Sequence, residues 1–82
     1  MHPQSIIFLG LGLNQLEYIQ AAKNQGYHLI GFDGNLNAEC RNLCDVSFTE
    51  KINNYETIIN ILKNFENIIG CVSEQTDNGL IT

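Results

Sequence analysis

The chain of 82 residues is long enough for one small domain and too short for two. Nine acidic residues against four Lys and Arg give a formal net charge of −5, which argues against nucleic acid or an anionic membrane as a partner, because both require a basic face. Apolar residues make up 44% of the sequence and charged residues 16%, a balance typical of a folded domain.

The amino terminus and the cysteines bear on the cellular compartment. Residues 1–5 lack the charged and apolar regions of a signal peptide, and no apolar run approaches the ~20 residues that span a bilayer. Cys40, Cys44 and Cys71 are an odd number of cysteines, which favours free thiols in a reducing cytoplasm. The Cys40–Cys44 spacing has no second ligand pair, so a zinc site is not expected.

The first half of the chain reads as strand, helix, strand. Ser5–Leu9 is a continuous apolar run that predicts a strand buried on both faces, and Gly10-Leu11-Gly12 follows at once. A helix to Lys23, ended by Gly26, is predicted by apolar residues at three-residue spacing: Leu13, Leu16, Ile19 and Ala22. Residues 27–33 then predict a second strand, and residues 35–45 are irregular, with a helical turn expected around residues 38–43.

The second half repeats this alternation. Residues 45–48 form a weak third strand, and Asn53 with Glu56 fits a capping box that opens a helix. The apolar stripe expected on that helix consists of Tyr55, Ile58, Ile59, Leu62 and Phe65. Ile68–Ser73 predicts a fourth buried strand in which Cys71 is a small buried side chain, and another helix is expected to begin before Thr82.

This order of elements predicts an α/β fold with four parallel strands. Because crossover connections are right-handed, the expected strand order is 3-2-1-4, half of a doubly wound sheet in a three-layer α/β/α arrangement. Residues 1–82 form one domain that stops inside a helix, so we expect the chain to be a fragment of a longer protein.

The glycine turn after the first strand resembles the start of a dinucleotide fingerprint. Gly10 permits a tight turn, Gly12 a close approach, and Asp33 lies about 20 residues further on, where a ribose-binding acid would sit. Gln15 argues against this interpretation, because the fingerprint has a small residue there. The alternatives are that both glycines only make a tight connection and that Asp33 is a solvated acid at a strand end.

A second polar segment faces this turn in the predicted topology. Strands 1 and 4 are neighbours, so Gly10–Gln15 and Ser73–Asp77 line the crevice at their carboxyl ends, where α/β folds bind ligands. Glu74 and Asp77 disfavour a pyrophosphate beside them and suit an amine, a hydroxyl or a metal-bound group. Capping of the following helix is the alternative role for these two acids.

Four segments together resemble the small pre-ATP-grasp domain at the amino terminus of ATP-grasp ligases. Residues 6–16 are similar to the opening of that domain, and residues 26–35, followed by Ala38, resemble its segment GYxVIxxDxNPxA. Residues 44–48 echo the third-strand segment ADxxxxxD, and Ser73–Asp77 match an SEQTD-like end of the fourth strand. The resemblance covers nearly the whole chain and is nearest the carbamoyl-phosphate-synthase-like and carboxylate–amine ligase branch. Leu36 stands where the family has proline.

The resemblance implies a Rossmann-like domain within a cytoplasmic ATP-dependent ligase. The complete enzyme would activate a carboxylate as an acyl-phosphate for attack by an amine, with ATP and Mg²⁺ held by ATP-grasp domains outside this chain. This domain would bind part of the carboxylate or amine substrate. The substrate contacts that the resemblance implies are Gly10, Gly12, Asn14, Gln15, Glu74 and Asp77.

The same resemblance implies no catalytic residue, metal ligand or cofactor site within these 82 residues, so the chain alone is expected to be inactive. Its partners would be the remaining ATP-grasp domains, and the isolated fragment is expected to self-associate through apolar surface that the missing helix would cover. Two other classes of function stay open: a stand-alone dinucleotide- or nucleotide-binding module, and an adaptor that binds no small molecule.

Overall fold

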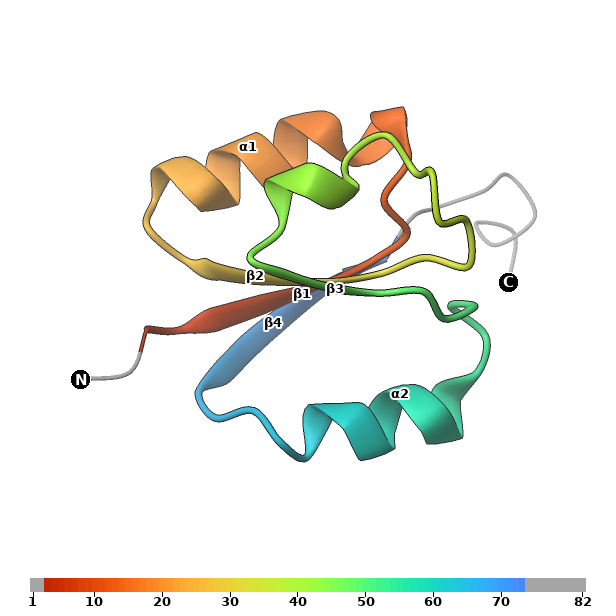
Figure 1. The fold of residues 1–82 in the computed structure, drawn as a ribbon. Helices are drawn as coiled ribbons and strands as arrows, with labels where there is room; N and C mark the ends of the chain where they lie inside the picture. Colours follow the sequence, from red (N-terminus) through yellow and green to blue (C-terminus); the bar gives the residue numbers. More distant parts are fainter. Residues whose placement is uncertain (1–2, 74–82) are drawn as a thin grey trace, which may run out of the picture.

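The structure, a computed structural model that describes residues 3–73, is a four-stranded parallel sheet with a helical layer on each face (Figure 1). The strand order is β3-β2-β1-β4, as predicted. The elements are β1 (Ser5–Leu9), η1 (Leu13–Gln15), α1 (Leu16–Asn24), β2 (His28–Phe32), η2 (Arg41–Leu43), β3 (Val46–Phe48), α2 (Tyr55–Leu62) and β4 (Ile68–Ser73). This is an α/β, Rossmann-like arrangement, in which α1 and the short 3₁₀ turn η2 cover one face and α2 the other.

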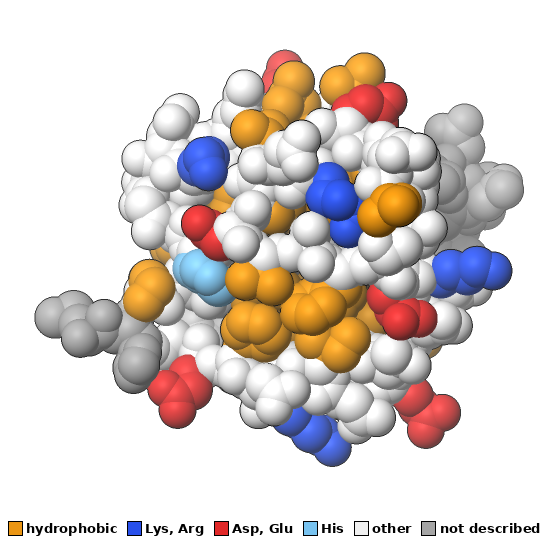
Figure 2. All heavy atoms as spheres, viewed as in Figure 1, with side chains coloured by type: hydrophobic (Ala, Val, Ile, Leu, Met, Phe, Trp, Pro, Cys, Tyr) orange, Lys and Arg blue, Asp and Glu red, His pale blue; other side chains and the backbone are white. Residues whose placement is uncertain are grey.

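Two apolar clusters hold these layers to the sheet. On the α1 face, Phe8 of β1 and Leu29 of β2 pack with Ile19 of α1, and all three are almost completely buried. On the α2 face, Ile7, Ile30 and Phe32 pack with Ile58. Figure 2 shows apolar side chains gathered between the two helical layers. Burial of alternate strand residues on opposite faces therefore joins both layers to one sheet.

Aromatic side chains extend the core on the α2 face. The rings of Phe32 and Phe48 stack with centroids 5.2 Å apart. Phe65 meets Phe48 edge-on at 6.3 Å. These offset and edge-to-face contacts are the geometries that aromatic quadrupoles favour. They join the ends of β2 and β3 to the segment that follows α2.

The end of α1 confirms the predicted glycine cap. Gly26 has a φ of +86°. Its N–H donates to the carbonyl of Lys23 at 3.0 Å, and the N–H of Tyr27 donates to the carbonyl of Ala22 at 3.2 Å. This pair of bonds is a Schellman motif, which requires the left-handed conformation that glycine adopts without strain.

Both predicted helices differ from the structure at their amino-terminal ends. Leu13 belongs to η1 and is 62% exposed, so it is not part of the buried stripe of α1. The predicted Asn53–Glu56 capping box is wrong, because Asn54 is the N-cap of α2 and makes no side-chain capping bond. The Asn54 amide instead donates to Oε1 of Glu50 at 2.6 Å.

The apolar stripe of α2 is also rotated relative to the prediction. Tyr55 and Ile59 are exposed, whereas Ile58 is buried and Ile61 and Leu62 pack against the core. Because isoleucine occurs at both positions 58 and 59, the sequence alone does not show which of the two residues faces the sheet. The packing of α2 on β1 and β2 selects Ile58.

The prediction that β4 is buried on both faces is wrong. Its residues alternate between half-buried and exposed, and Cys71 is exposed rather than buried. Cys71 pairs with Ile7 and so shares the α2 face, but the α2 cluster is centred on β1 and β2. Among the described residues, β4 pairs only with β1 and forms an edge of the sheet, so part of one face is uncovered.

None of the helices within residues 3–73 is long and apolar enough to cross a membrane.

Candidate functional site

The ends of β1 and β4 lie side by side, as the predicted crevice requires. The register pairs Leu9 with Ser73, the last residue of each strand. The glycine turn that follows β1 is therefore beside the point where β4 ends. Glu74 and Asp77, the two acids predicted at this crevice, lie outside the described residues.

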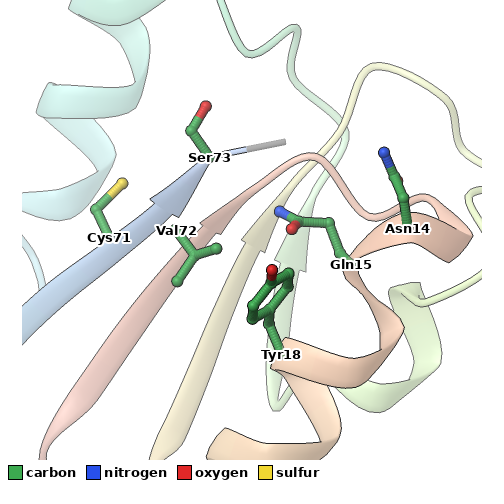
Figure 3. A pocket seen from close by; sticks show the side chains of 6 residues that line it. All are labelled: Asn14, Gln15, Tyr18, Cys71, Val72 and Ser73. Carbon is green, nitrogen blue, oxygen red and sulfur yellow. The ribbon is translucent and has the colours of Figure 1, made fainter. Parts of the chain in front are cut away.

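A cavity of about 550 Å³ occupies this position (Figure 3). Asn14, Gln15 and Tyr18 line it from the start of the first helical layer, and residues 71–73 line it from β4. Its polar side chains on the α1 side are the carboxamides of Asn14 and Gln15 and the hydroxyl of Tyr18, whereas Cys71 and Ser73 project to the other side of β4 (Figure 3). No charged side chain occurs in this described lining. The volume lies within the range of sites for small molecules.

The structure thus brings together two of the predicted contact residues, Asn14 and Gln15. Tyr18 and Cys71 were not predicted to line a site. The signal for Tyr18 is its spacing, because a residue four positions after Asn14 lies on the same side of a helix. The signal for Cys71 is that its strand, β4, is the last in the strand order and pairs with β1 alone among the described strands.

The two glycines of the turn have different roles. Gly10 has a φ of +101°, and its N–H donates to the carbonyl of Phe32 at 2.8 Å. Gly12 is extended and precedes η1, and its carbonyl accepts bonds from the N–H of Gln15 at 3.0 Å and the thiol of Cys40 at 3.4 Å. Gly10 is therefore required by the backbone conformation, while the Gly12 carbonyl is engaged within the protein.

Gln15 fills the position where a dinucleotide fingerprint has a small residue. Its side chain is only 3% exposed, although it forms part of the cavity wall. Nε2 donates to the carbonyl of Gly10 at 3.3 Å, with the carbonyl of Leu9 at 3.5 Å. The carboxamide thus packs against the end of β1 and fixes the glycine turn to the start of the helical layer.

Asp33 has a structural role at the end of β2. Its Oδ2 accepts the N–H of Leu11 at 2.8 Å, and its Oδ1 accepts the N–H of Asn35 at 2.8 Å. Both carboxylate oxygens are therefore engaged by backbone groups of this chain. Asp33 is half-buried, and a ribose hydroxyl would have to compete with these two bonds.

Arg41, which the sequence did not single out, stabilises the same region. Its guanidinium donates to the carbonyl of Asp33 at 2.9 Å and to the carbonyl of Asn35 at 2.8 Å. The loop after β2 is thus held from both sides, by Asp33 to the glycine turn and by Arg41 to η2.

The thiols near these loops are not activated as nucleophiles. Burial, followed by the negative charge of Asp45, raises the pKa of Cys44 to about 11. Partial desolvation also raises the pKa of Cys71, although its side chain is exposed. A nucleophilic cysteine needs a lowered pKa, so this site offers hydrogen-bonding groups rather than a thiolate. Within residues 3–73, no group of three or more His, Cys, Asp or Glu side chains is placed to hold a metal ion.

Fold and cavity together define a Rossmann-like α/β domain with a polar crevice at its topological switch point. Comparison with known proteins finds no family model that matches this chain and no similar sequence among curated proteins. The function is therefore inferred from the cavity and from the sequence motifs.

Proposed function

We propose that this chain is the N-terminal substrate-binding domain of a cytoplasmic, ATP-dependent ligase. The enzyme would activate a carboxylate as an acyl-phosphate and transfer the acyl group to an amine. One observation supports this most strongly. The cavity at the switch point is lined by Asn14 and Gln15, two of the residues that the pre-ATP-grasp resemblance implies as substrate contacts.

The residues have separate roles in this proposal. Gly10 and Gly12 shape the turn, Asn14 and Gln15 contact the substrate, and Glu74 with Asp77 add negative charge from the segment after β4. ATP and Mg²⁺ are bound by other domains of the enzyme. In this proposal the domain binds and positions substrate, and phosphoryl transfer takes place in the other domains.

A stand-alone dinucleotide-binding module explains the same residues less well. The Asp33 carboxylate already accepts two backbone N–H bonds. Gln15 occupies the place where the fingerprint requires close packing of helix on strand. An adaptor without a ligand leaves the polar cavity between α1 and β4 unexplained.

Two measurements test this proposal. Calorimetry of the 82-residue chain with NAD, NADP, FAD and ATP–Mg²⁺ at millimolar concentration should show no binding. A micromolar dissociation constant for a dinucleotide would favour the stand-alone dinucleotide-binding module. The natural reading frame should encode an ATP-grasp region after codon 82. A frame that encodes no such region would refute the ligase.

A further inference from the structure

The orientation of the Gln15 carboxamide indicates which chemical group the cavity recognises. Gln15 is only 3% exposed, and its Nε2 faces the carbonyl oxygens of Gly10 at 3.3 Å and Leu9 at 3.5 Å. The reverse orientation would place Oε1 against two acceptors, which repel it. The NH₂ group of this amide therefore bonds within the protein, and its oxygen, Oε1, does not.

The acceptor, Oε1, accepts no hydrogen bond from any described residue. Gln15 lines the cavity, so this oxygen is the group that a ligand can engage. Figure 3 shows the Gln15 and Tyr18 side chains projecting from the start of the helical layer toward the strand that carries Val72 and Ser73. Among the described residues, Nε of Arg41 is the only fully buried polar side-chain atom without a partner, so Oε1 of Gln15 is open to the cavity, where a ligand N–H can replace water as its donor.

The charge of the lining points the same way. The described lining contains no Lys or Arg that could neutralise a carboxylate or a phosphate. Bringing an anionic group into this cavity, beside carboxamide and hydroxyl oxygens, would lose its hydration without a compensating charge. An N–H-bearing group, by contrast, meets acceptors, and the net charge of −5 on the chain favours a cation over an anion.

From these observations we infer that the cavity binds the N–H-bearing end of a small molecule, with Gln15 Oε1 as the acceptor. The inference rests on the proposed function and narrows it: this domain holds the nitrogen-containing end of a substrate, not its carboxylate end. An ammonium and a neutral carboxamide both present such N–H donors, and the experiment separates them.

The test is a titration of the ¹⁵N-labelled 82-residue chain, followed by NMR, with ethylammonium chloride, propionamide and sodium acetate, and with sodium chloride as the salt control. Ethylammonium or propionamide should shift the Gln15 side-chain resonances and the backbone amides of residues 14–18 and 71–73, and acetate should not. A larger response to ethylammonium identifies a cationic amine, and a larger response to propionamide identifies a neutral amide.

Two variants and a control sharpen the result. Gln15→Met keeps the length of the side chain and removes the acceptor, so binding should weaken about 10- to 150-fold for the ammonium and about 2- to 12-fold for the amide. Tyr18→Phe removes the hydroxyl of a residue that is 60% exposed and lies outside the core, so it tests the cavity if Gln15→Met fails to fold. Asn60→Ala, on the exposed side of α2, should bind as the parent does.

The outcomes separate this inference from the proposed function. Acetate shifts that equal or exceed those of the N–H probes, or no shift with any probe, overturn the inference even where the reading frame encodes an ATP-grasp region. Selective binding of an N–H probe by a protein whose gene lacks such a region supports the site and refutes the ligase.

Discussion

Replacing Asp33 with asparagine should destabilise the domain by removing a bond between β2 and the glycine turn. The two carboxylate oxygens accept the N–H groups of Leu11 and Asn35, each at 2.8 Å. Asparagine keeps one acceptor and turns an NH₂ group toward the other N–H. Loss of one hydrogen bond to a charged group costs about 1.5–3 kcal/mol. That is a large share of the roughly 4–12 kcal/mol expected for a domain of this size.

Urea denaturation followed by circular dichroism measures this change in the free energy of unfolding. In a thermal melt the melting temperature should fall by roughly 8–16 °C. About 2 kcal/mol of stability is lost, and each kcal/mol shifts the melting temperature of a domain of this size by about 4–8 °C. Glu39→Gln is the matched control, because Glu39 is exposed and makes no interaction within the described chain; it should change stability by less than ~0.5 kcal/mol. Equal stability of Asp33→Asn and the control variant would refute the structural role of Asp33. If Asp33→Asn instead loses affinity for a dinucleotide while its stability is unchanged, the ribose-binding interpretation is restored.

Three further predictions follow from backbone conformation, thiol chemistry and exposed surface. Gly26→Ala should destabilise by about 1–2 kcal/mol because φ is +86°, whereas Gly70→Ala, which also has no atom within 4 Å of the new Cβ, should be neutral or stabilising; equal effects in thermal melts would contradict this. At pH 8 a disulfide reagent such as DTNB should react first with Cys71, because this thiol is exposed. The slow reaction of Cys44 should accelerate about tenfold per pH unit up to its pKa of about 11, because only the thiolate reacts. Loss of the fast phase in Cys44→Ser rather than in Cys71→Ser would refute this assignment. We also expect self-association in sedimentation, because large apolar side chains are exposed on α1, α2 and β4; a monomer at millimolar concentration would contradict it.

The strands were predictable because their signals are local. The bounds of β1 and β4 coincide with the predicted ones, since each is an apolar run that ends at a glycine or a polar residue. With strands and helices alternating, the right-handed crossover rule left few strand orders, and 3-2-1-4 is the one found.

The features that were missed depend on contacts between distant residues. The bond from Leu11 to Asp33 spans 22 residues and exists because the register of β1 and β2 places the glycine turn beside the end of β2. The exposure of Cys71 depends on what covers an edge strand, which its apolar neighbours in sequence do not reveal. Two adjacent asparagines, 53 and 54, made the N-cap of α2 ambiguous from sequence alone.

The candidate site was predictable in outline. The topology places the turn after β1 beside the end of β4, so Asn14 and Gln15 could be located before the structure was known. The direction of the Gln15 amide could not be predicted, because it follows from the positions of the Leu9 and Gly10 carbonyls in the folded turn. The contributions of Glu74 and Asp77 stay predictions.

Steady-state kinetics of the protein made from its complete natural reading frame test the central claim most directly. ATP turnover should depend on a carboxylate and an amine substrate. Glu74→Gln should lower kcat/KM for the substrate held in this crevice by about 10- to 150-fold, while KM for ATP stays nearly unchanged, because one charged hydrogen-bond partner is lost and ATP binds elsewhere. Absence of ATP turnover with every carboxylate and amine pair, or unchanged substrate kinetics in Glu74→Gln beside a loss of stability, would contradict the assignment of this domain to substrate binding in a ligase.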